Sequence, residues 1–421
     1  MDRKKLLPVL AFGLALLACG CQAGPVTPTP TLASDATVGG LPSTPVPSIT
    51  NTPVPPIADT PIPSPTKNPL PPDLPVVASP VLARIDFQDE NDGWGIAVND
   101  SGYVVRTVDG GRTWLNATPP GAGSIGFSAN LTVLNTNTAW VLVPEVDFFS
   151  GTLYRTGDGG ITWDSSPVPF GGADLQFLDA SIGRALASQG GRAGSEAVEL
   201  FQSSDGGATW VSVFHNDSSQ PGWSDSLPLD GIKNGMTFLD ANTGWVTGSI
   251  PVNGEIYLYI THDGGVSWSQ QSVPLPAGYA AYQYLPQAPV FFGNDGFLPL
   301  TIYLPDTIRF TCYTTHDGGI TWSGDPTDAN KVIKPGLTAF SDALHIWSWD
   351  GGTNLYSTTD GAQMWGSAIT SLDLSGGLAQ LEFVPGPASR FTGWALTCVD
   401  DAGRSGLYRT TDGSTWTQLI P

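Results

Sequence analysis

Between residues 81 and 421 the chain alternates apolar and polar residues in short stretches, which Gly, Asp, Asn and Ser separate. In the first such unit Phe87 and Trp94 mark two short strands, Tyr103 to Arg106 form a third, and Thr113 to Leu115 open a fourth. Short strands at regular spacing with turn residues between them are typical of all-β folds. No stretch keeps its apolar residues at the 3.6-residue spacing of a helix, so we expect almost no helix.

An eight-residue phrase, T-x-D-G-G-x-T-W, here called the box, recurs between the third and fourth strands of the units. Full copies end at Trp114, Trp163, Trp210, Trp268 and Trp322, and weaker copies end at Trp365 and Trp416. Successive box aspartates lie 43 to 58 residues apart, and a period near fifty indicates a propeller or a solenoid. Seven four-stranded units predict a seven-bladed β-propeller over residues 80–421, because radial repetition leaves only short sheet edges.

The residue types of the box suit a tight turn between two strands. The glycine pair accepts positive φ, the Asp side chain accepts hydrogen bonds from N–H groups of its own turn, and the Trp packs against the neighbouring blade. Sevenfold recurrence favours structure over catalysis, since an active site needs one constellation. We therefore assign a structural role to Asp109, Trp114, Asp158, Trp163, Asp205, Trp210, Asp263, Trp268, Asp317, Trp322, Asp360, Trp365, Asp412 and Trp416.

A second phrase, hydrophobic-x-Phe-x-Asp followed by Gly-Trp, precedes the boxes, as in Ile85 to Asp89 with Gly93-Trp94. The boxes are similar to the Asp-box, or BNR, repeats of sialidases and related propellers. The two phrases together resemble most the photosystem II stability and assembly factor-like family of seven-bladed propellers, over residues 81–421. The resemblance implies an extracytoplasmic protein connected with membrane-protein assembly. The basic surface patch associated with that family contrasts with a total of 17 Lys and Arg here.

The N-terminus has the features of a secretory signal: Arg3, Lys4 and Lys5, then an apolar run over residues 6–17 that is too short to span a bilayer comfortably. Leu16-Leu17-Ala18-Cys19 resembles the bacterial lipobox. We expect residues 1–18 to be a lipoprotein signal peptide and Cys19 to be lipidated; Cys21, or a cleaved signal with two incidental cysteines, are the alternatives. The protein would then be extracytoplasmic and anchored to the cell membrane by its N-terminal lipid.

Residues 19–79 are rich in Pro, Thr and Ser. Proline removes backbone donors and favours an extended chain, so we expect a disordered linker that separates the propeller from the lipid. The first repeat unit begins on an inner strand and the last ends on an outer one, so no exchange of strands between the termini is obvious and the sequence leaves the closure of the ring open. Cys312 and Cys398 fall in units five and seven, which are not neighbours, so we expect two buried free thiols.

The formal net charge is −21, which argues against nucleic acid and anionic lipid as partners. The four histidines have no ligand spacing, and the acidic stretch Asp89 to Gly93 lacks the alternating oxygen ligands of a calcium loop. We therefore expect no metal, no cofactor and a monomer.

Twelve of the fourteen tryptophans belong to boxes or to second strands, which leaves Trp223 and Trp349 unexplained by the repeats.

The unrepeated loops carry the candidate site. Box turns lie on one face of such a propeller, and the longer insertions of units two to five lie on the other, which we call the loop face. Aromatic side chains with a few polar groups make a plausible carbohydrate or peptide surface. The candidate ligand-binding residues are Glu145, Asp147, Phe148, Arg192, Glu196, Trp223, Asp225, Tyr279, Tyr282 and Tyr284.

Two functions fit these observations. The first is a binding or assembly scaffold for a protein or glycan, without catalytic residues of its own. The alternative is a secreted glycoside hydrolase of the Asp-box propeller type, which would use a carboxylate pair from Glu145, Asp147, Glu196 and Asp225. A sialidase is disfavoured, because Arg84-Ile85 is followed by Asp86 and not by the Pro of the sialidase F/Y-R-I-P motif.

Overall fold

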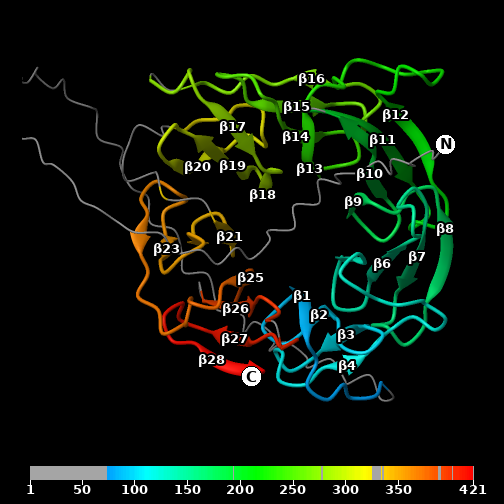
Figure 1. The fold of residues 1–421 in the computed structure, drawn as a ribbon, viewed down its shortest axis with the longest axis vertical. Helices are drawn as coiled ribbons and strands as arrows, with labels where there is room; N and C mark the ends of the chain where they lie inside the picture. Colours follow the sequence, from blue (N-terminus) through cyan, green and yellow to red (C-terminus); the bar gives the residue numbers. More distant parts are fainter. Residues whose placement is uncertain are drawn as a thin grey trace, which may run out of the picture. The chain divides into compact units, whose positions relative to one another are not determined.

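The computed structural model describes residues 74–192, 194–275, 278–324, 333, 336–386, 390–400 and 402–420. Seven four-stranded antiparallel sheets form a ring of blades, and the strands of each blade follow one another outward from the centre (Figure 1). The predicted seven-bladed all-β propeller is confirmed. The described residues contain no helix, and therefore none long and apolar enough to cross a bilayer. The predicted signal peptide and lipidation cysteines lie outside the described residues.

The strands of the seven blades have the following bounds. Blade 1 has β1 (Leu82–Phe87), β2 (Gly93–Ala97), β3 (Tyr103–Thr107) and β4 (Leu115–Asn116); blade 2 has β5 (Asn130–Val133), β6 (Ala139–Pro144), β7 (Gly151–Thr156) and β8 (Asp164–Val168). Blade 3 has β9 (Ala173–Phe177), β10 (Gly183–Arg192), β11 (Ser195–Ser203) and β12 (Val211–His215); blade 4 has β13 (Ile232–Phe238), β14 (Gly244–Ser249), β15 (Tyr257–Thr261) and β16 (Ser269–Gln270). Blade 5 has β17 (Gln283–Pro286), β18 (Val290–Phe292), β19 (Asp295–Tyr303) and β20 (Ile308–Thr315); blade 6 has β21 (Leu337–Phe340), β22 (Ile346–Trp349), β23 (Leu355–Thr358) and β24 (Gly366–Ser367). Blade 7 has β25 (Leu378–Pro385), β26 (Phe391–Thr397), β27 (Leu407–Thr410) and β28 (Thr417–Ile420).

Blade 5 departs from the regular pattern. Both β17 and β18 pair with the long strand β19, so its innermost strand is interrupted between Pro286 and Val290. Its outer edge consists of single bridges from Thr314 to Ser323 and from Phe310 to Ile333. The interruption exposes a bend of the inner strand to the centre of the ring.

The six boxes of full length fold into the same hydrogen-bonded turn, for which blade 2 serves as the example. The shorter seventh box closes one residue earlier, where the Gly413 amide donates to the Thr410 hydroxyl. The Gly160 amide donates to the Thr156 hydroxyl at 2.9 Å, and the Thr162 amide donates to Asp158 Oδ1 at 2.9 Å. Gly159 and Gly160 have φ of 78° and 85°, which L side chains rarely adopt. A Cβ on Gly159 would also collide with the Arg106 side chain of blade 1. Glycine is therefore favoured at this position both by the backbone conformation and by the space available.

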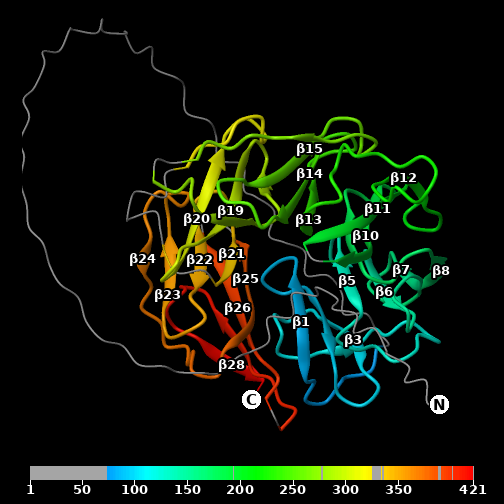
Figure 2. The same cartoon turned by 45° about the horizontal axis from the view of Figure 1, so that its top comes forward.

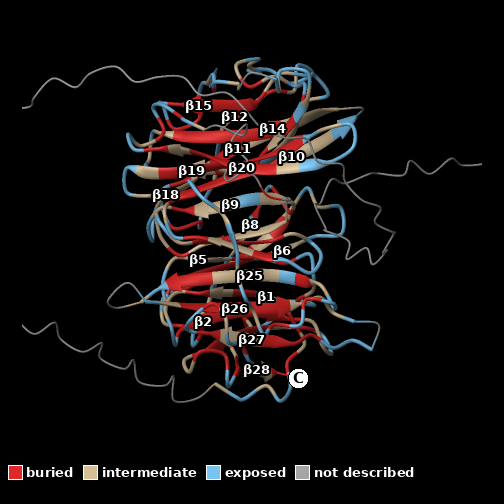
Figure 3. Ribbon diagram, turned by 90° about the vertical axis from the view of Figure 1, so that its left-hand side faces the viewer, coloured by how far each residue is buried: buried red, intermediate tan, exposed pale blue. Residues whose placement is uncertain are grey.

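The hydrophobic core is divided into seven clusters, one at each contact between neighbouring blades. Between blades 2 and 3, Trp140 of β6 stacks on Phe177 with ring centroids 3.6 Å apart, and the box Trp210 packs edge-on against Phe177. The Trp140 indole also donates to the carbonyl of Gly206 in the next box at 2.8 Å. Box and second-strand tryptophans thus join successive blades, and burial runs through the strands while the turns are exposed (Figure 3).

The described residues close the ring between blades 7 and 1 without a shared strand, a point that the sequence left open. Phe87 stacks on Trp394 with centroids 3.7 Å apart, and the Trp394 indole donates to Gly110 of the first box at 3.0 Å. The segment before β1 lies along β4, where the Asn116 amide donates to the Pro75 carbonyl. The described part of the propeller therefore starts at Leu74, before the expected boundary at residue 80.

No disulfide joins Cys312 and Cys398, as predicted for cysteines of blades 5 and 7. The expectation that both thiols are buried is wrong for Cys398, which is only half-buried. Cys398 follows the end of β26, where the chain leaves the sheet, whereas Cys312 lies inside β20.

Candidate functional site

A cavity of about 360 Å³ lies where the innermost strands of blades 1 to 4 and the bend between β17 and β18 of blade 5 face the centre of the ring, and we call it the channel cavity. Figure 2 shows β1, β5 and β13 around this space. Its lining consists of Arg84, Asp86, Asn130, Leu131, Thr132, Val133, Asp174, Leu175, Asn234, Gly235, Met236 and Ala288. The volume is within the ~300–1,000 Å³ that small-ligand sites usually occupy.

Side chains of the innermost strands hold neighbouring blades together at the centre. Each innermost strand has one edge without a partner strand, and its N–H and C=O groups need other partners. Gln176 of blade 3 binds Phe238 of blade 4 twice: its Oε1 accepts from the Phe238 amide at 2.7 Å and its Nε2 donates to the Phe238 carbonyl at 2.9 Å. Gln380 binds Ile85 across the ring closure in the same manner. The polar side chains that make these inner-edge bonds are therefore not available to bind a ligand.

The contact between blades 1 and 2 lacks these inner-edge bonds. Arg84 and Asp86 of β1 occupy positions whose equivalents in blade 7, Gln380 and Glu382, bind the backbone of the next blade. Arg84 instead donates to the Asn130 side chain at 3.3 Å, and Asp86 accepts from the Gln88 amide nitrogen at 2.5 Å. Two charged side chains therefore face the channel cavity without binding the main chain of β5.

Asp174 of β9 brings a second carboxylate to the same cavity. The surrounding protein raises the pKa of Asp174, and the Glu196 charge adds to the shift, while Arg84 opposes it. The pKa of Asp86 is raised to about 6, mainly by burial, against the opposing effects of Arg84 and Gln88. Neither carboxylate forms an ion pair with Arg84 or any other described cation. The cavity thus holds two carboxyls and one guanidinium whose hydrogen-bonding capacity is largely unused.

Glu382 of β25 lies next to this site at the ring closure. Its Oε1 accepts from the Phe87 amide at 2.6 Å, whereas its Oε2 is buried without a hydrogen-bond partner among the described residues. Burial, and then the charge of Asp86, raise the pKa of Glu382 to about 8. Glu382 is therefore largely protonated at pH 7 and adds no full negative charge beside Asp86.

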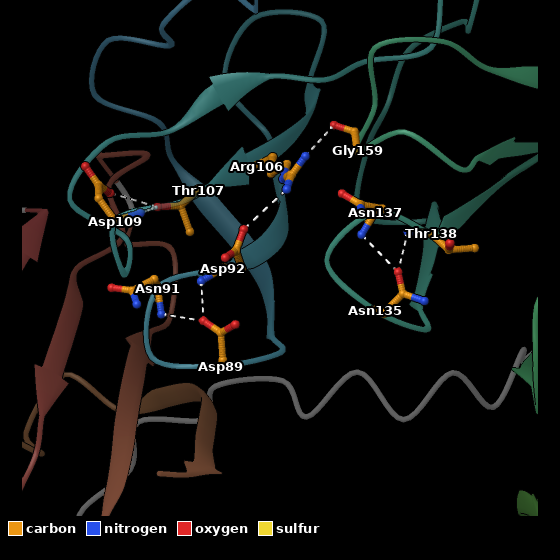
Figure 4. Close-up of polar contacts among 10 residues, drawn as sticks. All are labelled: Asp89, Asn91, Asp92, Arg106, Thr107, Asp109, Asn135, Asn137, Thr138 and Gly159. Carbon is orange, nitrogen blue, oxygen red and sulfur yellow. Dashed lines mark hydrogen bonds and ion pairs between the residues drawn. The ribbon is translucent and has the colours of Figure 1, made fainter. Parts of the chain in front are cut away.

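A buried ion pair inside blade 1 lies farther out, and its arginine also reaches the box of blade 2, as Figure 4 shows. Arg106 binds Asp92 at 3.2 Å and donates to the carbonyl of Gly159 in the next box at 3.1 Å, and its guanidinium lies 5.6 Å from the centroid of Trp94. In the acidic stretch before it, Asp89 accepts from the amide of Asp92 at 2.8 Å, which makes a tight turn. No group of described residues could hold a metal ion. Arg106 is used by the blade contact and is not free to bind a ligand.

The structure places the predicted loop-face residues in separate groups. Glu145, Asp147 and Phe148 lie in the hairpin between β6 and β7, where both carboxylates are exposed. Phe148 has a φ of 62°, and its carbonyl accepts from the amides of Gly171 and Gly172 at 3.0 Å. This hairpin is thereby fixed against the connection to blade 3.

Arg192 and Glu196 end β10 and begin β11 rather than lying in a loop. Arg192 is exposed, but Glu196 is engaged: it accepts from the Ser188 hydroxyl at 2.6 Å and from the Lys233 amide at 2.7 Å. The Lys233 ammonium donates in turn to main-chain carbonyls, among them that of Pro228 at 2.7 Å. Glu196 therefore fastens the β10–β11 hairpin to blade 4.

The aromatic residues of the predicted surface differ in exposure. Trp223 is 47% exposed and lies with exposed Asp225 in the loop after β12. Tyr279 and Tyr282 are half-buried with ring centroids 6.0 Å apart. Tyr284 was expected in a loop, but it is buried in β17, and its hydroxyl donates to the Tyr279 carbonyl at 2.6 Å. The reason is that the inner strand of blade 5 starts earlier than its repeat phrase indicates.

Sequence reasoning missed the channel cavity. A signal was present: Arg84, Asp86 and Asp174 are charged, although inner strands of other blades carry Thr or Gln near these positions, as at Thr132, Gln176 and Thr237. A deviation from the repeat inside a buried strand is as informative as an unrepeated loop.

No family model matches the sequence. The chain is 24% identical over 230 residues to the photosystem II assembly lipoprotein Ycf48 of Synechococcus sp. (strain CC9902), a match that covers 48% of this chain and 65% of that protein, less than two thirds of its length. This similarity, together with the seven-bladed ring, agrees with the resemblance drawn from the box phrases. A xyloglucanase from Xanthomonas campestris has the same fold, at 14% identity and a TM-score of 0.51 over 82% of this chain and 55% of its own. A structure of YCF48 bound to D1 peptide aligns with a TM-score of 0.49 and 15% identity over 80% of this chain and 99% of that one.

Proposed function

We propose that this protein is a binding and assembly scaffold, in which the propeller holds a segment of a protein partner. The observation that carries the proposal is the channel cavity, where Asp86 makes no hydrogen bond to blade 2 and Arg84 makes one, to the Asn130 side chain. The sequence similarity to a photosystem II assembly lipoprotein supports it. The loop-face residues, with exposed Trp223 and Asp147 among them, would provide further contacts to the partner around the rim.

The scaffold would act outside the cytoplasm, tethered through Cys19 and the Pro- and Thr-rich residues that follow it. The lipobox-like sequence before Cys19 supports this part of the proposal, and Cys21 is the alternative attachment site. Membrane fractionation of the wild type and of Cys19→Ser and Cys21→Ser tests it. Release from the membrane by Cys19→Ser alone is expected. If neither replacement releases the protein, the lipid anchor is contradicted.

Site-specific photocrosslinking in cells tests the scaffold itself. A photoreactive amino acid at Asn234, which is exposed and lines the channel cavity, and one at Trp223 on the loop side should capture the same defined protein. The matched control is Ile161, which is 50% exposed in the box turn of blade 2. Capture at Ile161 alone, or at none of the three positions, would contradict the proposed scaffold.

A glycoside hydrolase is the second candidate, and one observation favours it. The pKa values of Asp86 and Asp174 are raised, and a carboxyl of raised pKa can protonate a leaving group in such enzymes. A panel of chromogenic glycosides tests this alternative. Turnover that Asp86→Asn, Asp174→Asn or the loop-face replacement Asp147→Asn abolishes would make the protein an enzyme rather than a scaffold.

A further inference from the structure

We propose that the channel cavity binds a single cationic side chain, a lysine or an arginine, presented by an extended segment of the protein partner. This inference rests on the proposed function and adds to it the chemistry of the partner. It assigns Asp86 and Asp174 to the cationic group and Arg84 to a carbonyl oxygen of the same segment.

The ionised side chains of the lining carry a net charge of about −1, which one bound cation would neutralise. Asp86 and Asp174 contribute two carboxylates and Arg84 one guanidinium, and none of them is paired with the others. One bound cation would make the group of four neutral. The net charge of −21 over the whole chain attracts cations to the site from a distance.

The polar groups are arranged for a ligand with both donors and acceptors. The carboxylates accept only, and the Arg84 guanidinium donates only, so a ligand that bridges them needs donors and an acceptor. Arg84 uses one of its N–H groups on Asn130 and has others to offer. A basic side chain supplies the donors, and its main-chain carbonyl supplies the acceptor.

The apolar part of the lining favours a long side chain over a free metal ion or a sugar. Val133, Met236 and Ala288 line the same cavity, and the methylene stem of a lysine or arginine packs well against such atoms. None of the described residues that line the cavity is aromatic, and stacking on aromatic rings is what a carbohydrate site would be expected to offer. A cationic peptide side chain satisfies the charge, the donors and the apolar wall together.

Calorimetric titration of the full chain tests the inference. The probes are three capped glycine- and serine-based heptapeptides that differ only in their central residue, which is lysine, norleucine or glutamate. The lysine peptide should bind at least ~10-fold tighter than the norleucine peptide, a difference of about 1.4 kcal/mol, and the glutamate peptide should bind weakest. Equal affinities for lysine and norleucine, or no binding of the lysine peptide, would overturn the inference.

Charge variants of the cavity give opposite shifts that a loss of folding would not imitate. Asp86→Asn with Asp174→Asn should reduce the lysine preference to within ~2-fold. Arg84→Gln should instead tighten the lysine peptide ~3-fold, because it removes a repulsive charge while the glutamine amide can still donate to the carbonyl oxygen of the segment. Asp164→Asn, in the exposed outer strand β8, is the control and should change nothing. A lysine preference that survives the double replacement would overturn the inference. If crosslinking captures a partner while this preference is absent, the scaffold stands and only the cationic ligand fails.

Discussion

The aspartates of the boxes and the aspartates of the channel cavity behave in opposite ways. Asp205 of the third box accepts from the Thr209 amide at 2.9 Å and from the hydroxyls of Thr209 and Ser203, and these bonds lower its pKa to about 2. Asp86 accepts only from a side-chain amide, and burial raises its pKa to about 6. A carboxylate whose oxygens accept several hydrogen bonds from its own turn is structural. A carboxylate in the cavity that accepts few hydrogen bonds from the protein is available to a ligand.

The largest effect should come from breaking a contact between blades. Trp140 is fully buried, stacks on Phe177 and binds Gly206 of the next box, so Trp140→Ala removes both a large apolar group and a hydrogen bond. We expect a loss of about 3–5 kcal/mol in the free energy of unfolding, measured by urea denaturation. Trp223→Ala, at a half-exposed position, should cost less than about 1 kcal/mol. Equal losses would mean that the second-strand tryptophans do not join the blades.

Removal of a box carboxylate should have the next largest effect and should depend on pH. Asp205→Ala should cost about 1–3 kcal/mol at pH 7, because the turn loses several bonds to one carboxylate. The folded-state pKa of Asp205 is lowered, so its contribution is present above its ordinary pKa near 4 and is lost as the pH falls through about 2. Thermal melts of the wild type and the variant should therefore converge near pH 2. A difference that does not change with pH would contradict the charged hydrogen bonds.

The contribution of Glu382 to stability should depend on pH in the opposite direction to that of Asp205. Its folded-state pKa is raised to about 8, so between its ordinary pKa and pH 8 the folded chain binds more protons than the unfolded chain, and stability falls as the pH rises. Glu382→Gln keeps an acceptor for the Phe87 amide and cannot ionise. We expect it to stabilise the ring at pH 8.5 by on the order of 1–2 kcal/mol and to be nearly neutral at pH 4. A loss of stability at both pH values would show that the ionised carboxylate is needed for ring closure.

The smallest effect concerns the pH dependence of the proposed cation site. Asp86 faces Arg84 on its own strand and Gln88 just after that strand. From other strands it faces Glu382 on β25 and Asp174 on β9. Because the pKa of Asp86 is about 6, its charge is lost as the pH falls below that value. The affinity for the lysine peptide should therefore fall several-fold between pH 7.5 and pH 5. The norleucine peptide serves as control, and an affinity for lysine that is constant over this range would exclude Asp86 as a contact.

The fold could be predicted from the sequence because the boxes repeat. Seven box aspartates at regular spacing predicted the number of blades, and the five tryptophans predicted for second strands lie in β2, β6, β14, β22 and β26. Outside blade 5, the box tryptophans come just before the outer strands, as Trp114 does before β4. The repeat also predicted correctly that no disulfide joins Cys312 and Cys398. It failed for blade 5, where the inner strand β17 begins before the repeat phrase and buries Tyr284.

The channel cavity could not be predicted from the repeat, because closure of the ring decides which side chains share it. Asp86 lies beside Glu382, almost 300 residues away in the sequence, and the Phe87 amide and the Glu382 carboxylate are hydrogen-bonded over a separation of 295 residues. Asp174 reaches the same space from a third blade. Local pattern shows that these residues are unusual in their strands, but only the curvature of the ring brings them together.

The double variant Asp86→Asn and Asp174→Asn tests most directly the claim that channel carboxylates bind a ligand and box carboxylates hold the fold. Its melting temperature and its affinity for the lysine and norleucine peptides would be measured side by side at pH 7.5. The account predicts a melting temperature within about 2 °C of the wild type and no remaining preference for lysine. A variant that melts as early as Asp205→Ala while it still prefers lysine would contradict the account.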